Sequence, residues 1–459
     1  MALTGRAALV AAVGIVVVLI APEPGFALLG WLFVLAAAIT VDLVLAGSVR
    51  PLRFHRSGDN LVRLGQTGTV ELTVENPGPR RVQGVLRDAW PPSAGAAPRE
   101  LKLDVPAGER RRLVVTLTPT RRGDRASASV TVRSVGPLGL AARQGAHSAP
   151  WSVRVLPPFL SRKHLPSRLA KLRELEGQHP ALVRGQGTEF DSLREYVVGD
   201  DVRSIDWRAS ARRHDVVVRT WRPERDRRVL IVLDTGRTSA GRVGTAPVPL
   251  TGDTGRAPLE SLTPSDQARP VPGWPRLDWS MDAALLLAAL AARAGDRVDF
   301  LAYDRAVRAW VSGASRTELL TALVNSMAPI EAELIEADSP GMVANILSRA
   351  KRRCLVVLLT DLNASALDEG LMPVLPQLSS RHLVLVAGVS DPAVADIAGR
   401  KATAEEVYDA AAAEYTRIER RRITARLRRH GVEVVDAAPE DIAPALADAY
   451  LALKAAGRL

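Results

Sequence analysis

Aspartates stand directly after four apolar runs in the second half of the chain. They are Asp234 in DTGRTS, Asp304 in YDRA, Asp361 in TDLNAS and Asp391 in VSDPA. Carboxylates and hydroxyls that converge from several loops can hold a hard divalent cation such as Mg²⁺. Aspartate and serine are also common turn and helix-capping residues at such junctions, so a purely structural role stays open.

Other catalytic chemistry finds little support among the residues. The seven histidines are scattered, and no Ser/His/Asp set can be assembled. No Gly-x-x-x-x-Gly-Lys-Ser/Thr phosphate loop occurs, which argues against ATP hydrolysis by this chain. The single cysteine, Cys354, heads the apolar run CLVVLLTD and is expected to be a buried core thiol. We therefore expect a protein that is not an enzyme.

The aspartates need a scaffold that brings them together. Residues 228–459 alternate short, continuous apolar runs with helical stretches. This pattern predicts a doubly wound α/β domain, whose parallel sheet is covered on both faces and binds ligands at the carboxyl ends of its strands. Within it, residues 240–276 are rich in Pro, Gly, Thr and Ser and are expected to be a mobile insertion, which either gates that edge or is neutral.

The N-terminal residues 1–49 contain two apolar runs, 7–21 and 26–47, separated by a Pro/Gly turn. They predict a transmembrane helical hairpin. Arginines stand outside both runs and none stands in the turn, so the positive-inside rule puts both ends, and the rest of the chain, on the cytoplasmic side of the inner (plasma) membrane. Asp42, in the second run, is expected near the headgroups or against the partner helix.

Residues 50–157 change to a β pattern. The stretches TVELTVEN and ASVTVRSV alternate polar and apolar residues with a period of two, and turn clusters such as NPGP and RRGD separate the runs. Short strands with turn signals at this spacing predict a β-sandwich.

Residues 158–227 form a linker and a charged motif. From 190 to 228, ten arginines are interleaved with eight acids, a net charge of about +2. Interleaving favours bidentate ion pairs, whereas a nucleic-acid site would show uncompensated positive charge. The motif is therefore either an interdomain brace or a docking surface for another protein, and not a nucleic-acid site. Its candidate residues are Arg194, Asp200, Asp201, Arg203, Asp206, Trp207, Arg208 and Arg212.

A second basic stretch, residues 415–431, reads YTRIERRRITARLRRHG. It is predicted to be a helix with a solvated face stabilised by i,i+4 ion pairs. In an anchored chain it could also contact acidic lipid of the inner leaflet. The net charge of +11 is a modest excess for 459 residues and is only a weak indication of anionic partners.

The charged motif and its surroundings resemble a known bacterial family, the domain of unknown function fifty-eight. The resemblance is carried by GTEFDSLREYVVGDDVRSIDWRASARR, by VRTWRPERDRRVLIVLDTGRTSAG and, upstream, by PTRRGDRASASVTVRSVGPLGLAAR. It implies a von Willebrand factor A-like C-terminal domain, an N-terminal membrane anchor and an adaptor role beside a MoxR-type AAA+ ATPase.

Von Willebrand factor A domains bind a metal through Asp-x-Ser-x-Ser after the first strand and through a later Thr and Asp. The resemblance maps Asp234, Thr238 and Asp361 onto the first Asp, the second Ser and the last Asp. Gly236 replaces the first Ser and so removes one oxygen ligand. The separate Thr has no clear counterpart, and Thr317 is its candidate. We expect no cofactor, with Mg²⁺ as the cation that such a degenerate site could take.

Two functions follow from these observations. The first is a non-enzymatic, membrane-anchored adaptor that presents its α/β domain in the cytoplasm to a protein partner, by resemblance a MoxR-type ATPase. The alternative is a metal-dependent enzyme acting at the carboxyl edge of the sheet. Arg237 could supply positive charge between Asp234 and Asp361 without a metal, which would favour the adaptor.

Overall fold

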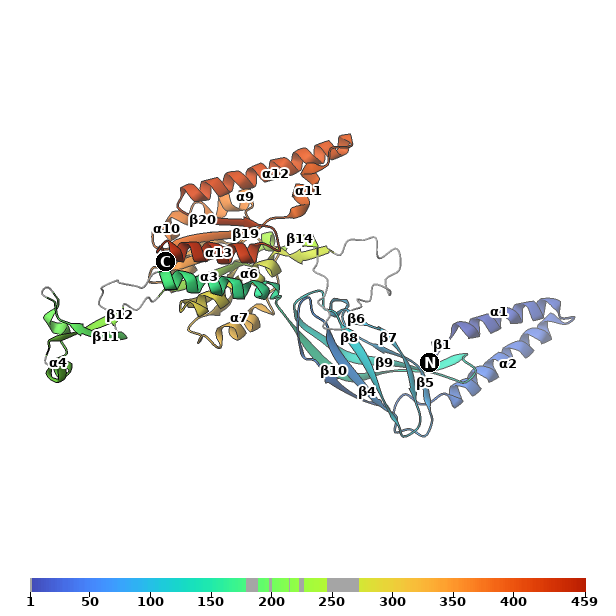
Figure 1. Ribbon diagram of the computed structural model, residues 1–459. Helices are drawn as coiled ribbons and strands as arrows, with labels where there is room; N and C mark the ends of the chain where they lie inside the picture. Colours follow the sequence, from blue (N-terminus) through green and yellow to red (C-terminus); the bar gives the residue numbers. More distant parts are fainter. Residues whose placement is uncertain (1, 179–188, 198–199, 214, 223–226, 246–271) are drawn as a thin grey trace. The chain divides into compact units, whose positions relative to one another are not determined.

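The computed structural model describes residues 2–178, 189–197, 200–213, 215–222, 227–245 and 272–459 (Figure 1). Two compact units divide the chain: one holds the N-terminal 158 residues, and the other holds most of the remainder. Most of the predicted mobile insertion, residues 246–271, lies outside the described residues.

Two apolar helices open the chain, α1 (Gly5–Ile20) and α2 (Pro24–Leu45). Proline at the first turn of α2 suits a helix start, because the amide it lacks would have no partner there. Among the described residues, α2 is the helix long and apolar enough to cross a membrane, whereas α1 has 16 residues and is shorter.

Asp42, near the end of α2, contacts the β-rich region rather than the partner helix. It is buried, and its carboxylate accepts backbone N–H bonds of 2.7 Å from Leu138, Leu140 and Ala141. These residues form a turn of the β-rich region and the start of β10. Three backbone donors therefore satisfy a carboxylate that the hydropathy pattern alone places in a membrane span.

The β-rich region contains two sheets, as the period-two alternation predicted. One sheet has the order β1-β10-β9-β5-β7, with β3 pairing β10, and the other has the order β2-β4-β8-β6. In β4 the alternate residues Val70, Leu72 and Val74 are buried, so one face of that sheet packs into the core. The strands are β1 (Ala2–Leu3), β2 (Arg53–Gly58), β3 (Leu61–Arg63), β4 (Gly68–Glu75), β5 (Val82–Asp88), β6 (Ala96–Ala97), β7 (Glu100–Val105), β8 (Arg110–Leu117), β9 (Gly123–Val135) and β10 (Ala141–Leu156).

A buried ion pair lies inside this region. The Nη2 atom of Arg56 donates to Asp88 at 2.6 Å and to Ser127 at 2.9 Å, and the Trp90 indole donates to the other Asp88 oxygen at 2.8 Å. Both charged side chains are almost wholly buried. The Nε and Nη1 atoms of Arg56 have no hydrogen-bond partner among the described residues, so Asp88 is the group that balances this charge.

The second unit is built on a six-stranded sheet with the order β17-β16-β13-β18-β19-β20. All neighbours are parallel except β17, which runs antiparallel at one edge. The strands are β13 (Arg228–Asp234), β16 (Arg297–Tyr303), β17 (Val307–Val311), β18 (Leu355–Leu359), β19 (Leu383–Val389) and β20 (Glu433–Ala437).

Helices cover both faces of this sheet, because its central strands are apolar on both sides. One face packs against α8 (Ser339–Arg349), α10 (Leu375–Ser379) and α12 (Ala404–Arg429). The other contacts α6 (Arg276–Arg293) and α13 (Ile442–Ala455), and α3 (Leu165–Gln178) packs on these two helices. Cys354, just before β18, is buried as predicted.

The charged motif folds as a β-hairpin with two short helices. Strands β11 (Glu189–Glu195) and β12 (Val217–Arg222) pair antiparallel. Between them lie the 3₁₀-helix η3 (Val202–Ser204) and the helix α4 (Trp207–Arg213). The whole segment is hereafter the charged hairpin.

Candidate functional site

Asp234 is the last residue of β13 and lies buried at the carboxyl edge of the sheet. Its Oδ1 accepts the backbone N–H of Gly236 at 2.8 Å, and its Oδ2 accepts the hydroxyls of Thr360 at 2.7 Å and Thr238 at 3.2 Å. Burial raises the pKa of Asp234, against the opposing effect of these hydrogen bonds. The carboxylate is thus held by neutral donors rather than by a charge.

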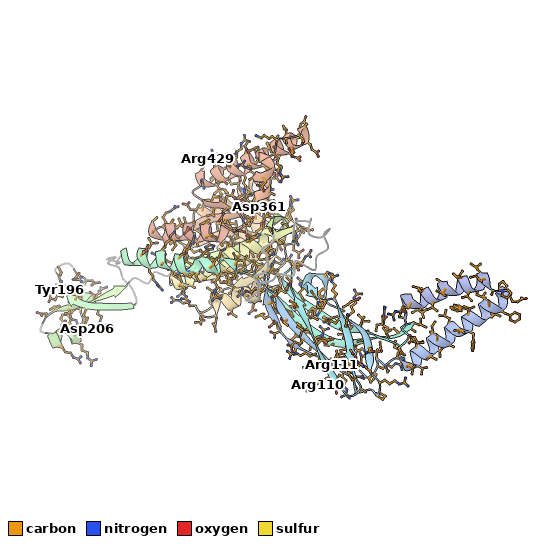
Figure 2. The ribbon with its side chains drawn as sticks, turned by 45° about the vertical axis from the view of Figure 1, so that its right-hand side comes forward. Arg110, Arg111, Tyr196, Asp206, Asp361 and Arg429 are labelled. Carbon is orange, nitrogen blue, oxygen red and sulfur yellow. The ribbon has the colours of Figure 1, made fainter. Side chains whose placement is uncertain are left out.

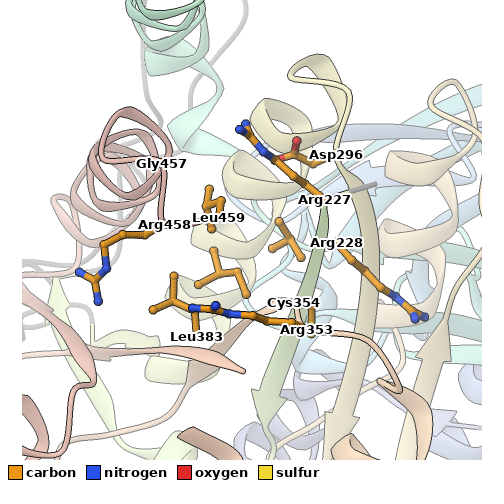
Figure 3. Close-up of a pocket in the computed structure, with 11 residues that line it drawn as sticks. Arg227, Arg228, Asp296, Arg353, Cys354, Leu383, Gly457, Arg458 and Leu459 are labelled. Atoms are coloured by element: carbon orange, nitrogen blue, oxygen red, sulfur yellow. The ribbon is translucent and has the colours of Figure 1, made fainter. Parts of the chain in front are cut away.

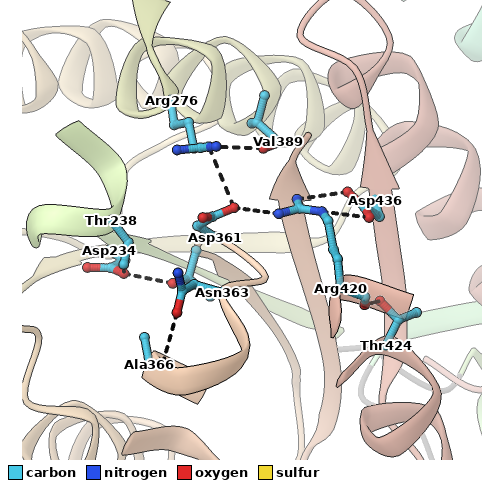
Figure 4. Close-up of polar contacts among 11 residues, drawn as sticks. Asp234, Thr238, Arg276, Asp361, Asn363, Ala366, Val389, Arg420, Thr424 and Asp436 are labelled. Carbon is cyan, nitrogen blue, oxygen red and sulfur yellow. Dashed lines mark hydrogen bonds and ion pairs between the residues drawn. The ribbon is translucent and has the colours of Figure 1, made fainter. Parts of the chain in front are cut away.

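Asp361, at the end of the neighbouring strand β18, has charged partners (Figure 4). Its Oδ1 lies 2.8 Å from Nη1 of Arg420, which comes from α12, and 3.5 Å from Nε of Arg276, which begins α6. Arg420 also makes two bonds of 2.8 Å to Asp436 of β20. One arginine therefore joins the ends of two strands, and we call Asp361, Arg420, Asp436 and Arg276 the rim latch.

Two further aspartates predicted at this edge are engaged differently. Asp304 is fully buried and accepts from Arg308 at 2.6 Å, from the hydroxyl of Thr235 at 3.0 Å and from two backbone N–H groups. Burial raises the pKa of Asp304, but the bonds from Arg308 and the backbone outweigh it and leave that pKa lowered. Asp391 caps the N-terminus of α11 (Pro392–Gly399) by accepting the N–H of Ala393 at 3.0 Å.

The residues at this edge do not fit a divalent cation in the arrangement seen. Asp361 is already neutralised by two arginines, and Gly236 brings no side-chain oxygen. The two hydroxyls nearest Asp234 donate to it, so their oxygens and that carboxylate satisfy one another. Within the described residues, no group of three or more His, Cys, Asp or Glu side chains could hold a metal ion.

Two residues that we expected to contribute here lie elsewhere. Arg237 pairs with Glu336 at 2.8 Å instead of standing between Asp234 and Asp361, and the rim latch supplies that charge. Thr317 lies 3.2 Å from Ser315, at an exposed position before α7 (Leu319–Met327). The threonine that contacts Asp234 is Thr360, and its signal was its place directly before Asp361 in the run LLTD.

Acidic and basic side chains of the charged hairpin form ion pairs with each other. Figure 2 labels Tyr196 and Asp206 in this segment. Arg194 bonds Asp200 at 2.5 Å, and Arg219 bonds Asp206 at 2.8 Å. Asp206 also accepts the N–H groups of Arg208 and Ala209, both at 3.0 Å, and so caps α4. The N–H of Ala209 and the side chain of Arg219 lower the pKa of Asp206.

The remaining candidates of the charged hairpin face solvent. Asp201 accepts the N–H of Arg203 at 3.0 Å, which fixes the turn at η3. The side chains of Arg203, Arg208 and Arg212 are exposed. Trp207 is 66% exposed, and the hairpin also exposes Val197 (61%) and Val202 (60%). Large apolar side chains that are exposed to solvent beside exposed arginine side chains are typical of protein contact surfaces.

The basic stretch predicted at 415–431 is the C-terminal half of α12, which begins at Ala404 behind a capping box formed by Thr403 and Glu406. Ion pairs do stabilise its exposed face, but at i,i+3 spacing. They join Arg417 to Glu414 and Arg422 to Glu419. Arg420 of the rim latch lies on the inner side of the same helix.

No curated protein matches this chain. Among solved structures, the β-rich N-terminal region resembles the CARDB domain of a Pyrococcus furiosus protein, crystallised with di-metal ions, at 20% identity and a TM-score of 0.18, over 23% of this chain and 91% of that one. A beta-glucosidase from Listeria innocua matches at 17% identity and a TM-score of 0.16, over 23% of this chain and 16% of that one.

The family comparison concerns the charged hairpin and the α/β sheet. The model described as "Protein of unknown function DUF58" matches residues 192–247 and 274–435. The match begins within β11 and continues into β20, and it includes Asp234, Asp361 and Arg420. By this match, residues 192–247 and 274–435 of the chain are similar to the DUF58 family.

Proposed function

We propose that this protein is a non-enzymatic, membrane-anchored adaptor whose charged hairpin docks a protein partner in the cytoplasm. The observation that carries the proposal is the surface of the hairpin. Its two internal ion pairs leave Trp207, Val197 and Val202 exposed. Tryptophan and arginine are the residues that most often dominate the energy of protein interfaces.

The rim latch also supports a non-enzymatic role, because it engages carboxylates that an enzyme would need. An enzyme acting at the carboxyl edge needs a carboxylate free to bind metal or move a proton. Asp361 is paired to two arginines, and Asp304 is paired to Arg308. The carboxylate of Asp234 accepts three hydrogen bonds. The described carboxylates of this edge are engaged in holding strand ends and loops together, which suits a rigid presenting domain.

The anchor and the partner complete the proposal. In it α1 and α2 form a multi-pass anchor, and the β-rich region and the second unit lie in the cytoplasm, as the arginine distribution favours. The second unit is taken as von Willebrand factor A-like, because a mostly parallel sheet covered on both faces suits that fold. The partner is a MoxR-type AAA+ ATPase, as implied by the resemblance of the charged motif to the DUF58 family.

The test is binding of the purified full chain, in neutral detergent, to the purified MoxR-type ATPase of the same organism. Trp207→Ala should weaken that binding at least about tenfold, the size expected for an interface hot spot. The matched control is Tyr408→Ala, which removes an aromatic side chain that is 79% exposed on α12. A stoichiometric complex that tolerates the control supports the adaptor. Equal binding by wild type and Trp207→Ala would contradict docking through the hairpin.

A further inference from the structure

A concentration of positive charge lies at the opposite edge of the same sheet, where the parallel strands begin. Arg228 starts β13, Arg297 starts β16, and Arg353 and Cys354 come directly before β18. Because amino ends of parallel strands share one edge, these residues lie close together and far along each strand from Asp234. This edge is distinct from the rim latch.

Two adjoining hollows occupy this edge, with volumes of about 470 and 830 Å³. They share Arg228, Asp296 and Arg353, and Figure 3 shows Arg227, Arg353 and Arg458 around the smaller one. We call the pair the amino-edge groove. Volumes of this size are those of sites for small molecules rather than for long peptides or duplexes.

The charge of the larger hollow is strongly one-sided. Seven cationic side chains and two carboxylates line it. Both carboxylates have partners. Asp299 forms an ion pair with Arg228, and Asp296 forms an ion pair with Lys454 and accepts a hydrogen bond from the hydroxyl of Tyr450. Two carboxylates cannot neutralise seven cations, so the lining of the larger hollow carries a net positive charge.

Three of these cations have no counter-charge within the described part of the chain. Arg316, Lys351 and Arg353 are exposed and form no hydrogen bond or ion pair with a described residue. Arg349 is held in place by Trp310, whose ring centre lies 5.2 Å from the guanidinium carbon. Like charges gathered in one concave surface repel each other, and a bound anion relieves that repulsion.

The lining also narrows the chemistry of the anion. Six of the seven cations of the larger hollow are arginines, whose forked guanidinium groups match phosphate and carboxylate oxygens. None of the described lining residues of either hollow is aromatic, so a nucleobase has no ring to stack on. We propose that the amino-edge groove binds a compact, phosphate-bearing anion, either a soluble polyphosphorylated molecule or the headgroup of an acidic phospholipid.

The test titrates the full chain, in neutral detergent at low ionic strength, with inorganic tripolyphosphate in a calorimeter. Arg316→Gln combined with Arg353→Gln should weaken binding at least about tenfold, since two counter-charges are lost. The matched control, Arg421→Gln with Arg422→Gln on α12, removes the same net charge from exposed side chains and should leave binding unchanged. Melting temperatures of all variants check that each is folded, and Lys351→Gln replaces the double variant if that one is not.

A second arm separates the sources of the phosphate. Short-chain phosphatidylglycerol below its micellar concentration is compared with glycerol phosphate and with tripolyphosphate. Tighter binding of the phospholipid than of glycerol phosphate assigns the groove to a lipid headgroup, and tightest binding of tripolyphosphate assigns it to a soluble ligand. The proposal is overturned if none of the three binds, if the control weakens binding equally, or if a hepta-aspartate peptide binds more tightly than any of them.

Discussion

Removing Arg420 should expose what the rim latch contributes. The side chain of Arg420 is 16% exposed and that of Asp361 is 9% exposed, so the pair is largely shielded from water. Breaking a buried pair by deleting one partner costs about 3–5 kcal/mol. Arg276 remains 3.5 Å from Asp361 and offsets part of that loss. We therefore expect Arg420→Met to destabilise the α/β sheet by about 2–4 kcal/mol.

The cause of that loss can be isolated with a second substitution. Arg420→Met leaves both Asp361 and Asp436 without this arginine, and Asp361→Asn removes the more buried of the two charges. The double variant should therefore recover part of the stability, with a coupling energy of about 1–3 kcal/mol. The control is Arg426→Met on the same helix, because Arg426 and Asp368 form an ion pair whose side chains are about half exposed. Such exposed pairs contribute about 0–1 kcal/mol.

Native-state hydrogen exchange is the suitable assay, because a chain of several folded parts has no single free energy of unfolding. The amides of β18 and β20 report the opening of the sheet next to the latch. The reasoning is wrong if Arg420→Met and Arg426→Met change exchange in β18 to the same extent. It is also wrong if the costs of Arg420→Met and Asp361→Asn simply add.

Three other buried aspartates, Asp282, Asp88 and Asp234, allow further tests. Burial raises the pKa of Asp282, in α6, from 3.8 to about 6. The folded state therefore holds this proton more tightly, so the contribution of Asp282 to stability is largest below pH 4 and falls by up to about 3 kcal/mol as pH rises from 4 to above 6. Asp282→Asn should remove this contribution to the pH dependence in melts between pH 4 and 7. In the β-rich region, Asp88→Ala leaves Arg56 buried without an anion and should cost about 3–5 kcal/mol, whereas unchanged melting of that region would show that water reaches the arginine. At the carboxyl edge, Mg²⁺ should bind no more tightly than millimolar in calorimetry, and micromolar binding abolished by Asp234→Ala would restore the enzyme alternative.

The elements of the α/β unit could be predicted from sequence because their strands are continuous apolar runs. Residues such as Leu230 to Leu233 are buried on both faces, and no surface helix or loop needs such a run. The parallel topology also implied that Asp234 and Asp361 would reach the same edge, which is where the structure places them. The apolar pattern therefore predicted the strands, and the rule that parallel strands end at one edge predicted the position of the two aspartates.

Partners distant in sequence could not be predicted in the same way. Arg420 reaches Asp361 across 59 positions, and nothing in its own segment sets it apart from the arginines around it. Only the packing of α12 on the sheet turns that arginine inward. The partners of Asp42 were missed for the same reason, since its donors lie about 100 residues away in a turn whose conformation the sequence did not reveal.

The bonds around Asp42 have a mechanical meaning. The turn that satisfies Asp42 also accepts the hydroxyl of Thr4, at 2.5 Å to the carbonyl of Gly139, and Arg143 donates to the carbonyl of Leu43 at 2.9 Å. Both ends of the helical hairpin are therefore hydrogen-bonded to one corner of the β-rich region. In the membrane-anchored protein that we propose, a tilt or rotation of α2, such as a change in bilayer thickness produces, would therefore move β10 directly, and the anchor would act as a lever and not as a tether.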